Sequence, residues 1–223
     1  MPPARAGRGC KPSTRVPPTG DTRGMREPVN VRLAVGADAP LVSNIHLLSR
    51  ASAYRGLLPD RYLDSVMPAE SAAFWPGRMA RLEAGAGVAY LAERDGAPIG
   101  FICLERPDQH GSVCVDNLHA FPEHKGLGAG STLLESARIW ALSRAATGLH
   151  LLVLEGNSPA VGFYESRGWR LAEHLDDRMG GIPVAMLRYE LSLTGMLKNI
   201  NPSQFPEKHR CFDSPANDKK PIG

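Results

Sequence analysis

The sequence predicts an α/β (α+β) domain in which a central mixed β-sheet is flanked by helices. Apolar residues alternate with period two in some segments and recur at helical spacing in others, and the two kinds are interleaved over residues 29–192. Asp95-Gly96 lies between two alternating runs, which is a strong hairpin signal. Residues 149–154 are nearly all apolar, as expected of a central strand that is covered on both faces.

The first half of this region alternates strand and helix patterns. Val29, Val31 and Leu33 alternate with other residues, which predicts a half-buried strand. Asp38 offers an N-cap for a helix whose apolar residues recur at helical spacing. The predicted elements here are a strand at 29–35, helices at 38–53, 60–66 and 69–84, strands at 88–93 and 99–105, and a strand at 113–121.

The second half begins with a helix over about 128–146, which places Leu133, Ala137 and Trp140 on one face. The apolar strand 149–154 follows. Ser158 is predicted to cap a short helix, with Pro159 at its first position, where proline is favoured. Two last strands, 169–174 and 182–191, form a hairpin across 176–181.

Composition divides the chain of 223 residues, 43% of them hydrophobic, into one domain and two tails. We expect residues 1–28 to be a disordered, basic, Pro/Gly-rich extension, 29–192 to form the domain, and 193–223 to be a disordered tail. Residues 1–28 carry a net charge of +4 and 195–223 one of +2, which leaves about −3 of the total +3 for the middle. A basic stripe for nucleic acid is therefore not expected in the domain.

The sequence predicts neither a membrane segment nor a metal site. It has no run of eighteen apolar residues and no secretory hydrophobic segment before the domain, so we expect a cytoplasmic protein. The histidines and cysteines show no metal-ligand spacing. Cys103 and Cys114 fall in predicted strands and are expected to be buried, reduced thiols.

The glycine-rich segment Lys125–Ser131 stands between a strand and a helix, where free backbone N–H groups and the helix dipole favour an anion such as phosphate. A mononucleotide P-loop does not fit, because its lysine follows the glycines. A dinucleotide site is a closer rival, with Gly126 and Gly128 in the loop and Glu155 as the ribose-binding acid. Against it, Ser131 occupies the third glycine position, and 122–125 separate strand from loop.

Three segments together resemble the GNAT family, the Gcn5-related N-acetyltransferases. Residues 118–130 resemble its acyl-CoA-binding signature, with Lys125 where Gln or Arg is usual. Residues 157–169 are similar to its second signature, with Trp169 where Phe is usual. Residues 53–60 are similar to a segment of many bacterial members, although these often have Trp at the position that Arg50 occupies here. The resemblance spans about 29–192 and implies the acyl-CoA N-acyltransferase (GNAT) fold, with two parallel central strands that splay apart.

The resemblance implies an enzyme that transfers the acetyl group of acetyl-CoA, its cosubstrate, directly to a primary amine of a small molecule or peptide. No metal takes part. The residues implied in cofactor binding are Leu118, His119, Ala120, Lys125, Gly126, Leu127, Gly128, Ala129, Gly130, Ser131 and Asn157.

Candidate catalytic residues follow from the chemistry of the reaction. Tyr164 matches the position that protonates the leaving thiolate, and a phenol remains protonated at neutral pH. The candidate bases are Asp116, His119, Glu105 and Glu155, which lie on or at the ends of predicted strands. Asp116 and His119 share one strand, where alternation places them on opposite faces, so that only one of them faces a given side. The resemblance places the acceptor near Tyr54 and Arg55.

Two other functions remain open at this point. A non-catalytic acyl-CoA-binding or regulatory module would keep the glycine loop without a working acceptor site. An NAD-type enzyme is the third interpretation. The expected partner is the amine acceptor, without nucleic acid or membrane, and a homodimer is one option for the assembly.

Overall fold

The computed structural model describes residues 28–195 of the chain. The predicted tails 1–28 and 193–223 lie outside the described residues, apart from residue 28 and residues 193–195. The elements, in chain order, are β1 (Asn30–Leu33), η1 (Gly36–Asp38), α1 (Ala39–Ala53), η2 (Tyr62–Val66), α2 (Met67–Arg81), η3 (Leu82–Ala86), β2 (Gly87–Arg94), β3 (Ala97–Glu105), β4 (Ser112–Ala120), η4 (Pro122–His124), α3 (Ala129–Ser143), β5 (Gly148–Leu154), α4 (Ser158–Glu165), β6 (Arg170–Met179) and β7 (Ile182–Ser192).

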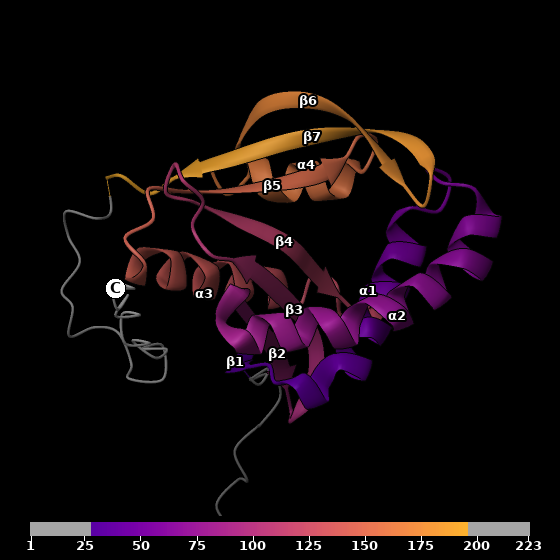
Figure 1. Cartoon of the computed structure of the whole chain (residues 1–223), viewed down its shortest axis with the longest axis horizontal. Helices are drawn as coiled ribbons and strands as arrows, with labels where there is room; N and C mark the ends of the chain where they lie inside the picture. The colour runs from indigo at the N-terminus through magenta and orange to yellow at the C-terminus, as the bar shows by residue number, and fades with distance from the viewer. Residues whose placement is uncertain (1–27, 196–223) are drawn as a thin grey trace, which may run out of the picture.

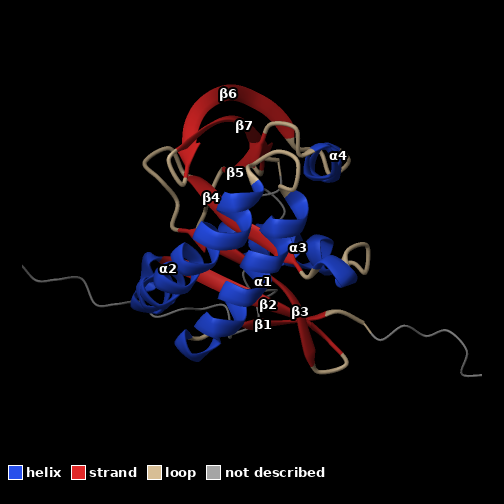
Figure 2. Ribbon diagram, turned by 90° about the vertical axis from the view of Figure 1, so that its right-hand side faces the viewer, coloured by secondary structure: helices blue, strands red, loops and turns tan. Residues whose placement is uncertain are grey.

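A seven-stranded mixed sheet forms the centre of the molecule, in the order β1-β2-β3-β4-β5-β7-β6. β4 and β5 run parallel, and every other neighbouring pair is antiparallel. The β6–β7 hairpin arches over one end of the sheet, beside β5, and β1–β3 form the other end (Figures 1 and 2). The predicted mixed sheet flanked by helices is confirmed, and a doubly wound dinucleotide fold, which needs a mostly parallel sheet, is excluded.

Helices cover both faces of the sheet because alternate residues of β2 and β3 point to opposite sides. Leu91 and Phe101 pack with Trp75 of α2 in the core beneath α1 and α2. Ile102, which follows Phe101, and Leu104 point to the other side of β3 and pack with α3 in the second and larger core. Leu133, Ala137 and Trp140 of α3 all lie in that larger core, as the sequence predicts.

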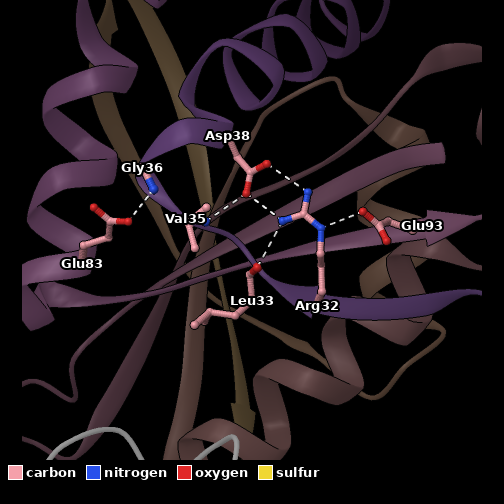
Figure 3. Close-up of polar contacts among 7 residues, drawn as sticks. All are labelled: Arg32, Leu33, Val35, Gly36, Asp38, Glu83 and Glu93. Atoms are coloured by element: carbon pink, nitrogen blue, oxygen red, sulfur yellow. Dashed lines mark hydrogen bonds and ion pairs between the residues drawn. The ribbon is translucent and has the colours of Figure 1, made fainter. Parts of the chain in front are cut away.

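A cluster of charged residues fixes the start of α1 (Figure 3). The guanidinium of Arg32 on β1 donates to both carboxylate oxygens of Asp38 at 2.7 and 2.9 Å and to Glu93 of β2 at 2.7 Å. This pairing holds the pKa of Asp38 below its usual range. Across the same turn, the backbone N–H of Gly36 donates to Glu83 of η3, which directly follows α2. The cluster therefore ties α1, which carries several site residues, to the sheet edge and to α2.

Two predicted helix caps are wrong in detail. Asp38 does precede α1, but its carboxylate binds Arg32 and the N–H of Val35 instead of capping the helix. The short helix α4 begins at Ser158, and its N-cap is Asn157, whose side-chain oxygen accepts from the N–H of Ala160 at 3.4 Å. An asparagine directly before Ser-Pro can cap as well as a serine, and local sequence does not decide between them.

The tip of the β6–β7 hairpin packs onto the segment between α1 and α2. A Cβ atom at Gly180 would stand 2.1 Å from the ring of Tyr62, so only glycine allows this approach. Around this contact, Met67 and Leu154 share a third core with Leu58. The hairpin tip thus closes one end of the region between α1, α2 and the sheet. Within residues 28–195, no helix has the length and apolar character needed to cross a bilayer.

Candidate active site

The parallel strands β4 and β5 separate after a short paired stretch. Pairing covers only Ser112–Cys114 of β4 and Gly148–His150 of β5. β4 then diverges from β5, which continues beside β7 (Figure 1). On the other side β4 remains paired with β3 as far as Ala120. The backbone of Leu118–Ala120 therefore has one edge that no described strand covers, as the predicted splay requires.

The glycine loop leads from this free edge into α3. Gly126 and Gly128 adopt left-handed φ angles of 77° and 95°, which L side chains rarely adopt, and Gly128 is the N-cap of α3. Within residues 28–195, the backbone N–H groups of Gly128, Ala129 and Gly130 have no hydrogen-bond acceptor. Leu127 is half-buried and Lys125 is exposed. Such a helix start can bind an anion, because free N–H groups and the positive end of the helix dipole point outward together.

Gly130 has a different task from the other two glycines. A Cβ atom here would stand 2.9 Å from Cζ of Phe163, so the missing side chain lets α3 approach α4. Phe163 in turn lies beneath the guanidinium of Arg167, 3.8 Å from the ring centre. The start of α3 is therefore held against α4 by close contact.

We expect Gly130→Ala to destabilise the protein by about 1 kcal/mol. Alanine gains about 1 kcal/mol of helix propensity, but overpacking against Phe163 costs roughly 1–3 kcal/mol. Gly162→Ala is the matched control, because a Cβ atom at Gly162 in α4 meets nothing within 4 Å and should leave stability unchanged or improved. Chemical denaturation of both variants measures the difference. Equal stabilisation of the two would contradict the contact.

Two arginines beside the loop were not anticipated from the sequence. Arg167 donates to the hydroxyl of Ser131 at 2.7 Å, and Arg94 donates to the carbonyl of Leu127 at 3.3 Å. With Lys125, they place three positive charges around the start of α3. The only sequence signal for Arg167 is its position directly before Gly168, inside the second family-like segment.

A β-bulge on β4 changes which side chains face the pocket. Cys103 pairs with Asn117 and the next β3 residue, Leu104, pairs with Val115, so Asp116 is an extra residue without a partner on β3. Asp116 and His119 consequently both face the helices α1 and α2. The expectation that they lie on opposite faces is wrong, because the extra residue shifts the alternation by one.

His119 is half-buried beneath α1. Its Nδ1 lies 3.1 Å from the hydroxyl of Ser49, and its ring is perpendicular to that of His46, with centres 4.9 Å apart. Burial lowers the pKa of His119 well below its usual value, and the nearby His46, Arg50 and Lys125 lower it further. His119 is therefore neutral at working pH and binds a proton weakly.

His46 is held in a single tautomer by the core. The indole N–H of Trp75 donates to its Nδ1 at 3.2 Å, so the neutral ring carries its proton on Nε2. Burial lowers the pKa of His46 to about 3, with a smaller contribution from Arg50. The two perpendicular imidazole rings of His46 and His119 are thus both uncharged.

Asp116 is bound from below by a buried arginine. Arg78 of α2 is 4% exposed, and its Nη2 lies 3.0 Å from Asp116 and 3.1 Å from Glu105. Asn117 donates a further hydrogen bond to Asp116 at 2.7 Å. Arg78 was not identified from the sequence, where it reads as one more polar residue on a helix surface.

Tyr164 and Tyr54 come together from opposite ends of the site. Tyr164 of α4 is 8% exposed and packs against Trp169, with ring centres 5.6 Å apart. Burial raises the pKa of Tyr164, and the neighbouring Tyr54 raises it further, so its hydroxyl stays protonated. Tyr54 follows α1, and burial raises its pKa also.

Arg55 lies at the surface and is occupied by its own loop. Its guanidinium pairs with Asp60 at 2.8 Å and with Asp64 at 2.7 Å. An acceptor that used Arg55 would have to compete with both carboxylates.

A pocket of about 290 Å³ lies between α1, α2 and β4. Most of its lining residues are polar or charged, with charges of both signs. The lining residues are His46, Arg50, Met67, Glu70, Ser71, Phe74, Asp116 and Asn117. It lies on the same face of the sheet as His119, whose ring contacts that of His46.

The cysteines are not nucleophiles in this arrangement. Cys103 is buried, Cys114 is half-buried, and both are free thiols. Burial raises the pKa of both, that of Cys114 to about 12, so neither forms a thiolate readily. In the described part of the chain, no three His, Cys, Asp or Glu side chains are grouped as a metal would require.

Comparison with solved structures shows the same fold in acetyltransferases. The chain is similar to PaiA N-acetyltransferase from Thermoplasma acidophilum, solved with coenzyme A, with 20% identity and a TM-score of 0.62 over 74% of this chain and 99% of that one. It is similar to a chimera of the Vibrio cholerae spermidine N-acetyltransferase with 19% identity and a TM-score of 0.58, over 77% and 99% of the two chains.

A third similar structure is the ribosomal-protein-S18-alanine N-acetyltransferase from Escherichia coli, with 17% identity and a TM-score of 0.55 over 78% of this chain and 99% of that one. The model of the acetyltransferase (GNAT) family matches residues 51–169, more than half of the chain. This range contains the bulge, the glycine loop and the segment from Asn157 to Trp169. The chain therefore belongs to the GNAT family of acetyltransferases, and the enzyme class that the sequence predicts, an acetyl-CoA-dependent N-acetyltransferase, is confirmed.

Proposed function

We propose that the protein transfers the acetyl group of acetyl-CoA directly to a primary amine of a small molecule or peptide. The observation that carries this proposal is the continuity of three features. The free edge of β4 leads into the donor-rich start of α3, and the polar pocket opens beside the same strand. A cofactor arm along β4 would thus end next to an acceptor in the pocket.

The residues around the glycine loop fit the pyrophosphate of coenzyme A. The free N–H groups from Gly128 to Gly130 are donors for phosphate oxygens, and Arg94, Arg167 and Lys125 add positive charge nearby. The side-chain oxygen of Asn157 caps α4, which leaves its NH₂ group as the part that would contact the cofactor. The Leu118–Ala120 backbone would bind the pantetheine arm and polarise the thioester carbonyl.

Bound acetyl-CoA supplies a thioester; the amine nitrogen bonds to its carbonyl carbon, the carbon–sulfur bond breaks, one amine proton departs and the thiolate gains a proton. We propose Tyr164 as the donor of that proton, because a phenol is protonated at neutral pH and burial, which raises its pKa, keeps it so. Asp116 and His119 both face the pocket side and remain the candidate bases. His119 holds a proton weakly, which suits orienting a water better than storing the proton.

Two measurements test this function. Thermal unfolding should shift with acetyl-CoA and CoA but not with NAD, and a ligand at 100 times its Kd adds about 2.7 kcal/mol of stability. Thiol release with a panel of primary amines should then show turnover. Stabilisation by NAD alone would sink the proposal, and CoA binding without turnover on any amine would favour a non-catalytic acyl-CoA-binding module. A cytoplasmic location and a homodimer stay predictions.

A further inference from the structure

Arg50 lines the pocket and, within residues 28–195, forms no ion pair with a carboxylate. Its guanidinium lies over the ring of Tyr54, 5.3 Å from the centre. Its charge opposes the rise in pKa of Tyr54 and Tyr62 and lowers the pKa of both histidines, His46 and His119. Arg50 is thus close to four titratable groups, each of them uncharged at neutral pH.

Apart from arginines that are exposed to water, namely Arg61, Arg81, Arg106, Arg144, Arg167, Arg170 and Arg178, the other arginines of the described domain have acceptors within the protein. Arg32, Arg55, Arg78, Arg138 and Arg188 each form an ion pair with Asp or Glu. Within residues 28–195, no such ion pair forms at Arg50, although the side chain is half-buried. A half-buried guanidinium that faces a pocket favours an anion from outside, and its planar fork matches a carboxylate.

The negative groups of the pocket are already engaged but remain accessible. Glu70 accepts from the hydroxyl of Tyr62 at 2.9 Å, and Asp116 is bound by Arg78 at 3.0 Å. Both carboxylates are exposed residues that line the same pocket as Arg50. The pocket therefore offers negative charge for an ammonium group and one unpaired positive charge for an acid.

We infer that Arg50 binds a carboxylate of the acceptor, so that the acceptor is an amine that also carries a carboxylate, such as an amino acid. The inference rests on the proposed function and names its substrate class. A purely cationic amine would meet Arg50 as a like charge. A zwitterionic acceptor instead places its carboxylate on Arg50 and directs its amine toward Asp116 and the free edge of β4.

The ring of Tyr54 connects this anion site with the reaction centre. Arg50 lies over Tyr54, and Tyr54 is close enough to Tyr164 to raise its pKa. Tyr164 is the proposed proton donor to the thiolate. Only the ring of Tyr54 therefore separates a carboxylate on Arg50 from Tyr164. This limits the length of the acceptor between its carboxylate and its amine.

The test compares acceptors in matched sets with the full chain. Each set holds an ω-amino acid, its amide and the alkylamine of equal length, for example glycine, glycinamide and ethylamine, then the β-alanine and γ-aminobutyrate sets. Thiol release gives kcat and KM for each. We expect the acid to be preferred at least 10-fold in kcat/KM within the set of the right length, with the preference lost at other lengths.

Arg50→Gln should raise KM for the preferred acid by about 10- to 100-fold, the value of a charge-assisted hydrogen bond, and leave the amide nearly unaffected. Arg50→Lys keeps the charge without the fork and should restore part of the preference. Arg81→Gln is the matched control, because it removes the same charge from an exposed position at the end of α2. Thermal unfolding and the shift with CoA verify that each variant folds.

Equal use of acids and amides, or a preference that survives Arg50→Gln, would overturn the inference. A loss of CoA affinity in Arg50→Gln at unchanged acceptor KM would also overturn it, since Arg50 would then serve the cofactor. If no amine is acetylated, calorimetry with the same acids and amides in the presence of CoA still shows whether Arg50 binds a carboxylate. Acid binding that depends on Arg50 would support the anion site while the proposed function fails, and absence of acid binding would contradict both.

Discussion

Tyr164→Phe is expected to lower kcat by about 100-fold while the affinity for acetyl-CoA stays nearly unchanged. The substitution removes only the hydroxyl, and the buried ring keeps its contact with Trp169. The hydroxyl is protonated at neutral pH, as an ordinary phenol is, and burial together with the neighbouring Tyr54 raises its pKa further, so it holds the proton that the leaving thiolate needs. Single-turnover kinetics, together with the thermal shift at saturating CoA, separate the chemical step from binding.

Tyr189→Phe provides the control for this substitution. The hydroxyl of Tyr189 donates to Glu165 at the end of α4, at 2.8 Å. This substitution also removes a tyrosine hydroxyl next to α4, but one that lies away from the free edge of β4. We expect a stability loss of about 1 kcal/mol and an unchanged kcat. If Tyr164→Phe keeps its full rate, Tyr164 is not the acid and its role is packing.

The second large effect is a loss of stability in mild acid. Between pH 7 and pH 5, His46 alone should remove about 2 kcal/mol from the free energy of unfolding. Its pKa is about 3 in the folded protein because of burial, compared with about 6.5 when unfolded, so the unfolded chain binds the proton first. The stability is fully present above about pH 6.5 and falls as the pH drops toward 3. His119 and His150, whose pKa values are also lowered, act in the same direction.

Chemical denaturation at pH 7, 6 and 5 measures this loss. His46→Gln should be less stable at pH 7, because it disturbs the bond from Trp75, but its stability should depend less on pH by about 2 kcal/mol over this range. His174→Gln replaces an exposed histidine of β6 and should keep the original pH dependence. An unchanged pH dependence in His46→Gln would show that His46 is not buried in its neutral form.

The fold was predictable because its signals are local. Period-two patterns identify the strands, Asp95-Gly96 identifies the first hairpin, and the apolar run 149–154 identifies a central strand. The face of α3 was predicted residue by residue, since helical spacing alone decides which side chains turn inward. The glycine loop was recognisable because left-handed φ angles restrict the residue type at Gly126 and Gly128.

The arrangement of the site was harder to predict from the sequence, because it depends on contacts between segments that are far apart along the chain. Arg78 is polar in the sequence and becomes a buried partner only when α2 meets Glu105 and Asp116 of the sheet. Arg167 reaches Ser131 across 36 positions of the chain. Arg55 reads as an available charge, and only the fold of its loop brings it between two carboxylates.

The bulge at Asp116 separates the chemistry of the cleft from the packing of the core. Val115 and Asn117 keep consecutive partners on β3, Leu104 and Cys103, so the ladder on either side does not depend on the residue between them. Position 116 is therefore the place on β4 where a side chain can change while the strand register and the buried Val115 are retained. Position 116 is thus adjustable within an otherwise constrained strand, as long as Glu105 remains to pair with the buried Arg78.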